Sequence, residues 1–216
     1  GRVGTIDGML KTARQRYDHY RMTTTDVPSA DLAKAVDYAA VLRAQGRADF
    51  ERDGRMAPTQ MGAFLYNLKA RLASGIVQIN QRMALLATRI GEAFSYATMA
   101  HESAHALARA QGRLSPESVI AGEIEAYRLQ YLWIKVIDPS AERMIVLLST
   151  LKLVLEEYPA DQVTRTAVAY LEHLLQLWDT NGEEAKLREL ILRLGYEESG
   201  HGHEGGVNPA ATSPWV

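Results

Sequence analysis

The sequence lacks cysteine altogether, which excludes disulfide bonds, thiolate catalysis and cysteine-ligated zinc. It also lacks an excess of one charge, because 24 lysines and arginines stand against 26 aspartates and glutamates and leave a net charge of −2. Overall charge therefore indicates no nucleic-acid partner and no anionic membrane surface, and only a local basic patch stays open. Long apolar runs are missing as well: the most apolar stretch, residues 144–155, contains Lys152 and is too short for a membrane span.

What the sequence does contain is typical of a folded, mainly helical protein. Of its 216 residues, 47% are hydrophobic and 23% are charged, which is the balance of an ordinary globular chain. Apolar residues recur at intervals of three and four along most of the chain, and β-branched alternating runs are rare. This pattern predicts helices over residues 5–20, 29–45, 59–73, 88–112, 116–137, 141–158, 160–179 and 183–194.

We expect these helices to form a single α-rich domain over residues 1–196, with a separate N-terminal helical segment over residues 1–57 as the alternative. Residues 197–216 are rich in glycine and contain prolines, so they are predicted to be a flexible tail. His201 and His203 lie in this tail, and we interpret them as part of the flexible segment rather than as metal ligands.

One segment is predicted to be a strand. It runs from Gly75 to Asn80, is rich in β-branched residues and is opened by a glycine. A single strand is not stable alone, so a small sheet or hairpin is implied, with a partner that the sequence does not identify.

The motif that carries chemistry is His101-Glu102-Ser103-Ala104-His105, an HExxH sequence in a strongly helical context. Residues four apart lie on one face of a helix, so His101 and His105 can direct ring nitrogens to one Zn²⁺. Glu102 lies beside this pair, where its carboxylate can reach a zinc-bound water as a general base without being a ligand. The alternative is a pair of core histidines hydrogen-bonded to carboxylates or to the backbone.

A catalytic zinc site needs a third protein ligand, and the next predicted helix offers Glu123 and Glu125. Helical periodicity does not choose between the two glutamates, because residues 116–137 are apolar around most of the helix circumference.

The order of these features resembles that of the gluzincin metallopeptidases, in which HExxH is followed on a second helix by a glutamate in an ExxA or ExxS context. Glu123-Ile124-Glu125-Ala126 fits ExxA, and the resemblance implies that Glu123 is the third ligand and Glu125 an outer or surface carboxylate. It further implies a zincin-like core with a small β-element and additional C-terminal helices. An edge strand before the HExxH helix binds extended substrate in the family, which implies a peptide or protein substrate along Gly75 to Asn80. The alternative is that Gly75 to Asn80 is a short buried core strand.

One position departs from the gluzincin pattern. Many gluzincins have an aspartate four residues after the ligand glutamate, which orients a ligand histidine, whereas this chain has Tyr127. A backbone carbonyl, Glu125 or Gln130 would then have to orient the histidine. Tyr127 lies one turn beyond Glu123, so its hydroxyl could donate a hydrogen bond to a developing oxyanion, or Tyr127 could be a packed aromatic residue.

These observations together predict zinc-dependent hydrolysis of peptide bonds. The alternative is a helical interaction or regulatory module that keeps a zincin fold and cleaves nothing. His173 lies on the helix predicted over residues 160–179, and we interpret it as a partly exposed structural residue rather than as a hydrogen-bond donor in the site.

Overall fold

The computed structural model describes residues 6–23, 30–54, 56, 60–81, 89–114, 119–137, 146, 149–150, 152–154, 156–157 and 162–196. Within these residues the protein is mainly helical and carries one small three-stranded sheet, as the sequence predicts. The elements in chain order are α1 (Ile6–Thr23), α2 (Ala30–Ala44), β1 (Ala48–Phe50), β2 (Gly62–Leu65), β3 (Ile76–Ile79), α4 (Arg89–Ala110), α5 (Val119–Ile137), α7 (Gln162–Asp179) and α8 (Glu184–Arg193).

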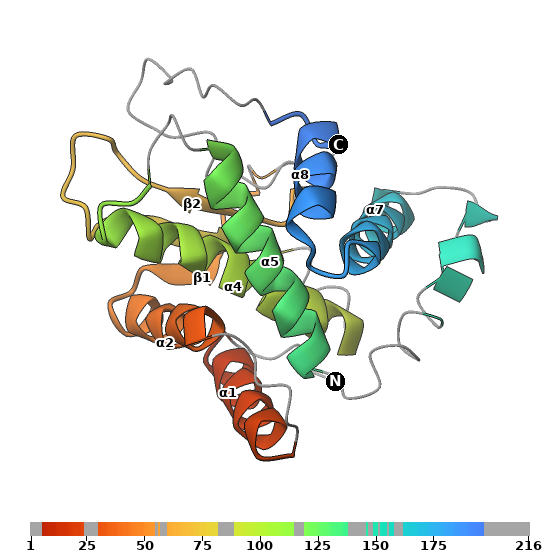
Figure 1. Ribbon diagram of the computed structural model, residues 1–216, viewed down its shortest axis with the longest axis horizontal. Helices are drawn as coiled ribbons and strands as arrows, with labels where there is room; N and C mark the ends of the chain where they lie inside the picture. Colours follow the sequence, from red (N-terminus) through yellow and green to blue (C-terminus); the bar gives the residue numbers. More distant parts are fainter. Residues whose placement is uncertain are drawn as a thin grey trace.

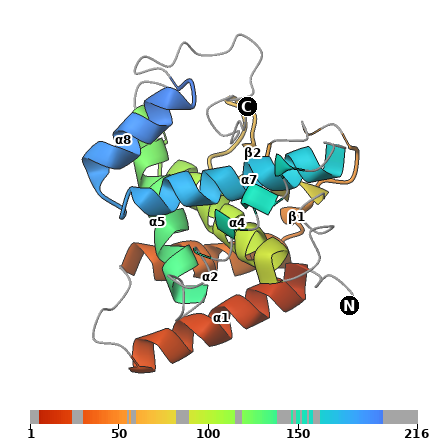
Figure 2. The same cartoon turned by 90° about the vertical axis from the view of Figure 1, so that its right-hand side faces the viewer.

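The packed pair of α4 and α5 forms the centre of the molecule. In both views α1 and α2 lie on one side of this pair, and α7 and α8 lie on the other (Figures 1 and 2). Both central helices bury alanines, and such small side chains allow two helix backbones to approach closely. The buried alanines are Ala97, Ala100, Ala104, Ala106 and Ala108 on α4 and Ala126 on α5.

The sheet packs on α4 through β2 and β3, and its strand order is β1-β3-β2. Strand β3 is therefore central, paired in parallel with β1 and antiparallel with β2. This confirms the strand predicted from Gly75 to Asn80, but its expected role as a substrate-binding edge strand is wrong. Both of its hydrogen-bonding edges are already occupied, so it cannot accept a further strand by β-augmentation.

The helix predicted over residues 59–73 is wrong, because this stretch contains β2. Met61, Ala63 and Phe64 are all buried, so the strand is apolar on both of its faces. Without an alternation of apolar and polar residues, its sequence resembles that of a buried helix. Gly62 disfavours a helix at this point. Pairing with β3, which is distant in the sequence, stabilises the extended conformation instead. Strand β1 was not predicted, since three residues are too few to show a pattern.

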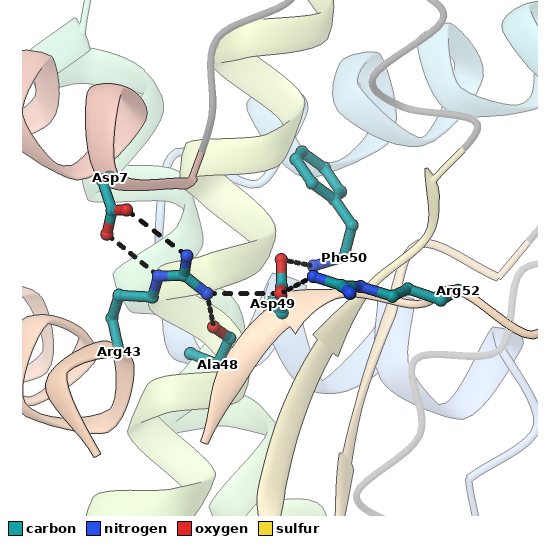
Figure 3. A network of polar contacts seen from close by, with 6 residues as sticks. All are labelled: Asp7, Arg43, Ala48, Asp49, Phe50 and Arg52. Atoms are coloured by element: carbon teal, nitrogen blue, oxygen red, sulfur yellow. Dashed lines mark hydrogen bonds and ion pairs between the residues drawn. The ribbon is translucent and has the colours of Figure 1, made fainter. Parts of the chain in front are cut away.

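An arginine connects the first two helices to the sheet (Figure 3). Arg43 Nε, at the end of α2, donates to Asp7 of α1 over 2.9 Å, and Arg43 Nη1 donates to the Ala48 carbonyl oxygen over 3.1 Å. Arg43 Nη1 also lies 3.3 Å from the carboxylate of Asp49 in β1. One guanidinium therefore bridges α1, α2 and the edge strand β1.

A second arginine, Arg109, fastens the connection between β2 and β3 to the end of α4. Its guanidinium is buried and donates hydrogen bonds of 2.6–3.4 Å to backbone carbonyl oxygens of Asn67, Ala70, Arg71 and Leu72. The guanidinium also lies over the ring of Tyr66, 4.4 Å from the ring centroid. A buried cation is stabilised here by oriented carbonyl dipoles rather than by a carboxylate.

The remaining predicted helices agree with the structure where it describes them. Helices α1, α2, α4, α5, α7 and α8 lie at the predicted places, and α4 ends before Gly112, whose φ of +71° suits a helix terminus. Of residues 141–158, the described residues from 146 to 156 are helical. The predicted tail over residues 197–216 lies outside the described residues. Among the described helices, none has the length and apolarity needed to cross a membrane.

The contacts of Arg109 predict that Arg109→Lys destabilises the protein even though it keeps the charge. A lysine ammonium is compact and offers three donors, so it cannot reach all of the carbonyl groups that the guanidinium fork contacts. We expect the free energy of unfolding, measured by urea denaturation, to fall by about 2–3 kcal/mol. Arg113→Lys is the matched control, because Arg113 is 47% exposed in a surface ion pair, and its effect should stay below about 0.5 kcal/mol. Equal stability of the two variants would contradict this account of Arg109.

Candidate metal centre

Three side chains from the two central helices meet in the core. His101 and His105 lie one turn apart on α4, and their Nε2 atoms are 3.2 Å apart. Glu123 reaches across from α5, with its Oε2 3.2 Å from His101 Nε2 and its Oε1 3.0 Å from His105 Nε2. The three residues are between 1% and 3% exposed. The structure thus brings together the three residues that the sequence analysis selected as metal ligands.

The orientation of His101 is set by Gln130, one of the candidates considered for this role. His101 Nδ1 donates a hydrogen bond to Gln130 Oε1 over 2.9 Å, and both residues are buried. With Nδ1 held in this way, Nε2 of His101 faces Glu123 and His105. Gln130 lies two turns after Glu123 on α5, so the same helix supplies both the carboxylate and the amide that contact His101.

Glu102 approaches the histidine pair from the sheet side. Its carboxylate and the two imidazoles form a buried group whose potential ligand atoms all lie within 4.8 Å of one another, and this group could hold a metal ion. Gly62 of β2 makes the close approach possible: a Cβ at Gly62 would lie 3.2 Å from Glu102 Cγ and 2.5 Å from Thr98 Cγ2. The absence of a side chain at Gly62 thus allows β2 to pack directly on Glu102.

Burial and charge act in opposite directions on the protonation of His105. Desolvation lowers its pKa, but the charge and hydrogen bond of Glu123, with smaller contributions from Glu102 and Glu125, raise the pKa to about 9. For Glu123, burial raises the pKa, while the two histidines outweigh burial and leave the pKa lowered. Without a metal, a proton on His105 therefore partly balances the buried carboxylates.

A row of packed rings extends from His101 to helix α7. The Tyr127 ring contacts the His101 ring edge-on with centroids 4.5 Å apart, and His173 of α7 contacts Tyr127 with centroids 5.7 Å apart. His173 is 1% exposed, so its predicted partial exposure is wrong. Burial, with a smaller effect of His101, holds the pKa of His173 well below its ordinary value, so it is neutral.

Tyr196, which follows α8, also belongs to this site. Burial, the charges of Glu123 and Glu102, and a hydrogen bond with Tyr127 raise the pKa of Tyr196 well above 10. It therefore remains a neutral phenol. No local signal marks Tyr196 or His173 in the sequence, because packing of the last two helices brings them to the motif.

Glu125, the second candidate acid on α5, lies elsewhere. Its carboxylate is 32% exposed and pairs with Arg113 at 3.2 Å. It lines a cleft of about 710 Å³ together with Leu107, Ile124 and Lys34. None of the residues of the ligand group lines this cleft, so the cleft and the buried cluster are separate features.

Comparisons of the chain with protein-family models, with curated proteins and with solved structures found no match. What the structure supports is a mainly helical protein with a buried His-Glu-His group that could hold a metal ion.

The charge balance predicts how the stability of the metal-free protein depends on pH. His105 has a folded-state pKa of about 9 against an ordinary value of 6.5, so its contribution is complete below pH 6.5 and is lost as pH rises through 9. After removal of metal with a chelator, the unfolding temperature should therefore fall between pH 6.5 and 9. Glu123→Gln should flatten this dependence and Glu125→Gln should keep it. An unfolding temperature that rises across this range would contradict the assignment.

Proposed function

We propose that this protein is a zinc-dependent peptidase of gluzincin-like design, with His101, His105 and Glu123 as the ligands that would hold the metal. The observation that carries the proposal is the convergence of two imidazole Nε2 atoms and one carboxylate within 3.0–3.2 Å of one another. Ligand atoms of a tetrahedral zinc ion with bonds of about 2.0–2.1 Å are separated by roughly 3.3 Å, so the donor set fits this metal.

Charge supports the same conclusion. Glu102 and Glu123 are both buried, at 0% and 1% exposure, beside histidines that a metal would require in the neutral form. Two buried carboxylates together carry a charge of −2, which a single divalent cation would neutralise. Arg109, the next basic residue on α4, contacts loop carbonyl groups instead. A divalent cation is therefore the expected partner of this cluster.

In the proposed reaction Glu102 is the general base and Glu123 is a ligand. A bound zinc ion would polarise the substrate carbonyl and lower the pKa of a coordinated water toward about 7. Glu102 would accept the proton of the attacking water and pass it to the leaving amine. Glu102 packs against Gly62 of β2, whereas Glu123 reaches the histidine pair from α5, so the two carboxylates come from different elements and can have different roles.

Tyr127 is the proposed donor to the oxyanion that forms as water attacks the carbonyl. Its ring lies edge-on against the ring of His101, and the raised pKa of Tyr196, to which Tyr127 contributes, places a second phenol near it. The ring of His173 also contacts the ring of Tyr127 and would hold Tyr127 in position. The raised pKa of Tyr196 keeps this second phenol neutral, as a hydrogen-bond donor must be.

Burial of the site favours a second candidate function. His101, Glu102, His105 and Glu123 are no more than 3% exposed, so a peptide reaches them only after the covering side chains move. A helical interaction or regulatory module, in which the metal has only a structural role, would need no such movement. Such a module would have no use for Glu102 as a base, and the following two measurements separate the candidates.

The ligand assignment predicts about one zinc ion per chain in protein purified without chelator. His101→Ala, His105→Ala and Glu123→Gln should each lower the zinc content strongly, measured by mass spectrometry of the metal, because two protein ligands seldom retain zinc at this affinity. Glu125→Gln is the matched control on the same helix and should keep its zinc. If Glu125→Gln loses zinc and Glu123→Gln does not, the ligand is Glu125.

The base assignment predicts that Glu102→Gln keeps its fold and its zinc but loses cleavage. The substitution preserves volume and removes basicity, and general base catalysis contributes about 10²–10⁴ in rate. Cleavage of a peptide library, followed by mass spectrometry, should slow by at least that factor, while circular dichroism and zinc content stay unchanged. A variant as active as wild type would exclude Glu102 as the base. A wild-type protein that binds zinc and cleaves no peptide of the library would favour the structural module.

A further inference from the structure

The loop between β2 and β3, residues 67–73, presents apolar and basic side chains to solvent. Every residue of this 67–73 loop is exposed. Leu68 is 43% exposed and Leu72 is 53% exposed, and Ile76 at the start of β3 is 40% exposed. Figure 1 shows this connection projecting from the edge of the molecule beside the C-terminal end of α4. Three aliphatic side chains thus remain in water around one protruding turn.

The polar backbone of the same loop is internally satisfied. Arg109 donates to the carbonyl oxygens of residues 67, 70, 71 and 72 from beneath. The amide of Lys69 donates to the Asn67 side chain over 2.9 Å, and the Ser74 hydroxyl donates to the Arg71 carbonyl. These bonds fasten the backbone of the loop to the end of α4, so its exposed side chains project from a fixed turn.

The charged side chains of the loop are of one sign. Along the sequence, residues 54–91 contain five basic residues and no acidic residue, although the whole chain has a net charge of −2. Two of the five, Lys69 and Arg71, lie in the loop itself and are exposed. Their long aliphatic stems can pack along an apolar surface while the charged groups stay in water. This is the local basic patch that the balanced overall composition conceals.

We propose that the 67–73 loop docks on an anionic lipid bilayer, with Leu68 and Leu72 inserted at the interface and Lys69 and Arg71 against lipid phosphates or carboxylates. A protein partner is less suited to this surface. A stable protein interface buries about 800 Å² on each side and is anchored by aromatic residues, whereas this loop is seven residues long and its neighbouring Tyr66 is buried under Arg109. The proposal does not depend on the peptidase assignment.

The test uses the full chain and extruded vesicles of phosphatidylcholine, with or without about 30% phosphatidylserine. In co-sedimentation, we expect wild type to bind the phosphatidylserine vesicles and to release them at high salt. The double variant Leu68→Ser/Leu72→Ser should lose at least about tenfold in partitioning, since two inserted leucines are removed. Lys69→Gln/Arg71→Gln should remove the preference for the anionic lipid. Leu192→Ser, at the matched exposure of 43% on α8, should bind like wild type.

The absence of cysteine allows a direct measurement of insertion. Leu72→Cys and Leu192→Cys can each be labelled at one site with an environment-sensitive fluorophore. Emission from position 72 should shift to shorter wavelength when phosphatidylserine vesicles are added, and emission from position 192 should not. A wild-type protein that binds neither kind of vesicle would overturn the proposal, and so would equal binding by the leucine double variant. Equal binding to both kinds of vesicle would overturn the assignment of an anionic surface.

Discussion

Packing of α4 on α5 is the interaction on which the candidate site depends. Neither helix contains the site alone: α4 supplies two imidazoles at a spacing of one turn, and α5 supplies Glu123 and Gln130. Ligand atoms within 3.2 Å of one another require the two backbones to hold their separation closely, and buried alanines on both helices permit a short separation. The sheet, α1 and α2 then pack around this pair and fix it.

The buried histidine and glutamate cluster shows how charged side chains can be stabilised in the core of a small protein. Its charged groups are paired with one another rather than with solvent, and the imidazole orientation is fixed by an uncharged amide, that of Gln130. An amide can hold a ring nitrogen without adding a further negative charge to two buried carboxylates. Arg109 illustrates the same principle at the other end of α4, where carbonyl dipoles accommodate a buried guanidinium.

Long periodic segments and the local motif were predictable from the sequence, whereas non-local pairings were not. The positions of α4 and α5 follow from helical periodicity, and the HExxH spacing alone places His101 and His105 on one face. Strand β2 was taken for a helix because three of its four residues are buried in succession and show no clear period, and because its identity depends on pairing with β3. Tyr196 and His173 could not be assigned to the site, because only the packing of α7 and α8 brings them to Tyr127.

Gly62 has a consequence for the evolution of the chain. The strand lies so close to α4 that a single methyl group at position 62 would overlap the Thr98 methyl at 2.5 Å and press on Glu102. Positions 62, 98 and 102 therefore cannot vary independently. In diverging relatives, alanine at 62 should occur together with a smaller residue at 98, and relatives that keep the glutamate should keep the glycine. The presence of glycine at position 62 should thus indicate whether a relative retains the carboxylate at position 102, on which this glycine packs.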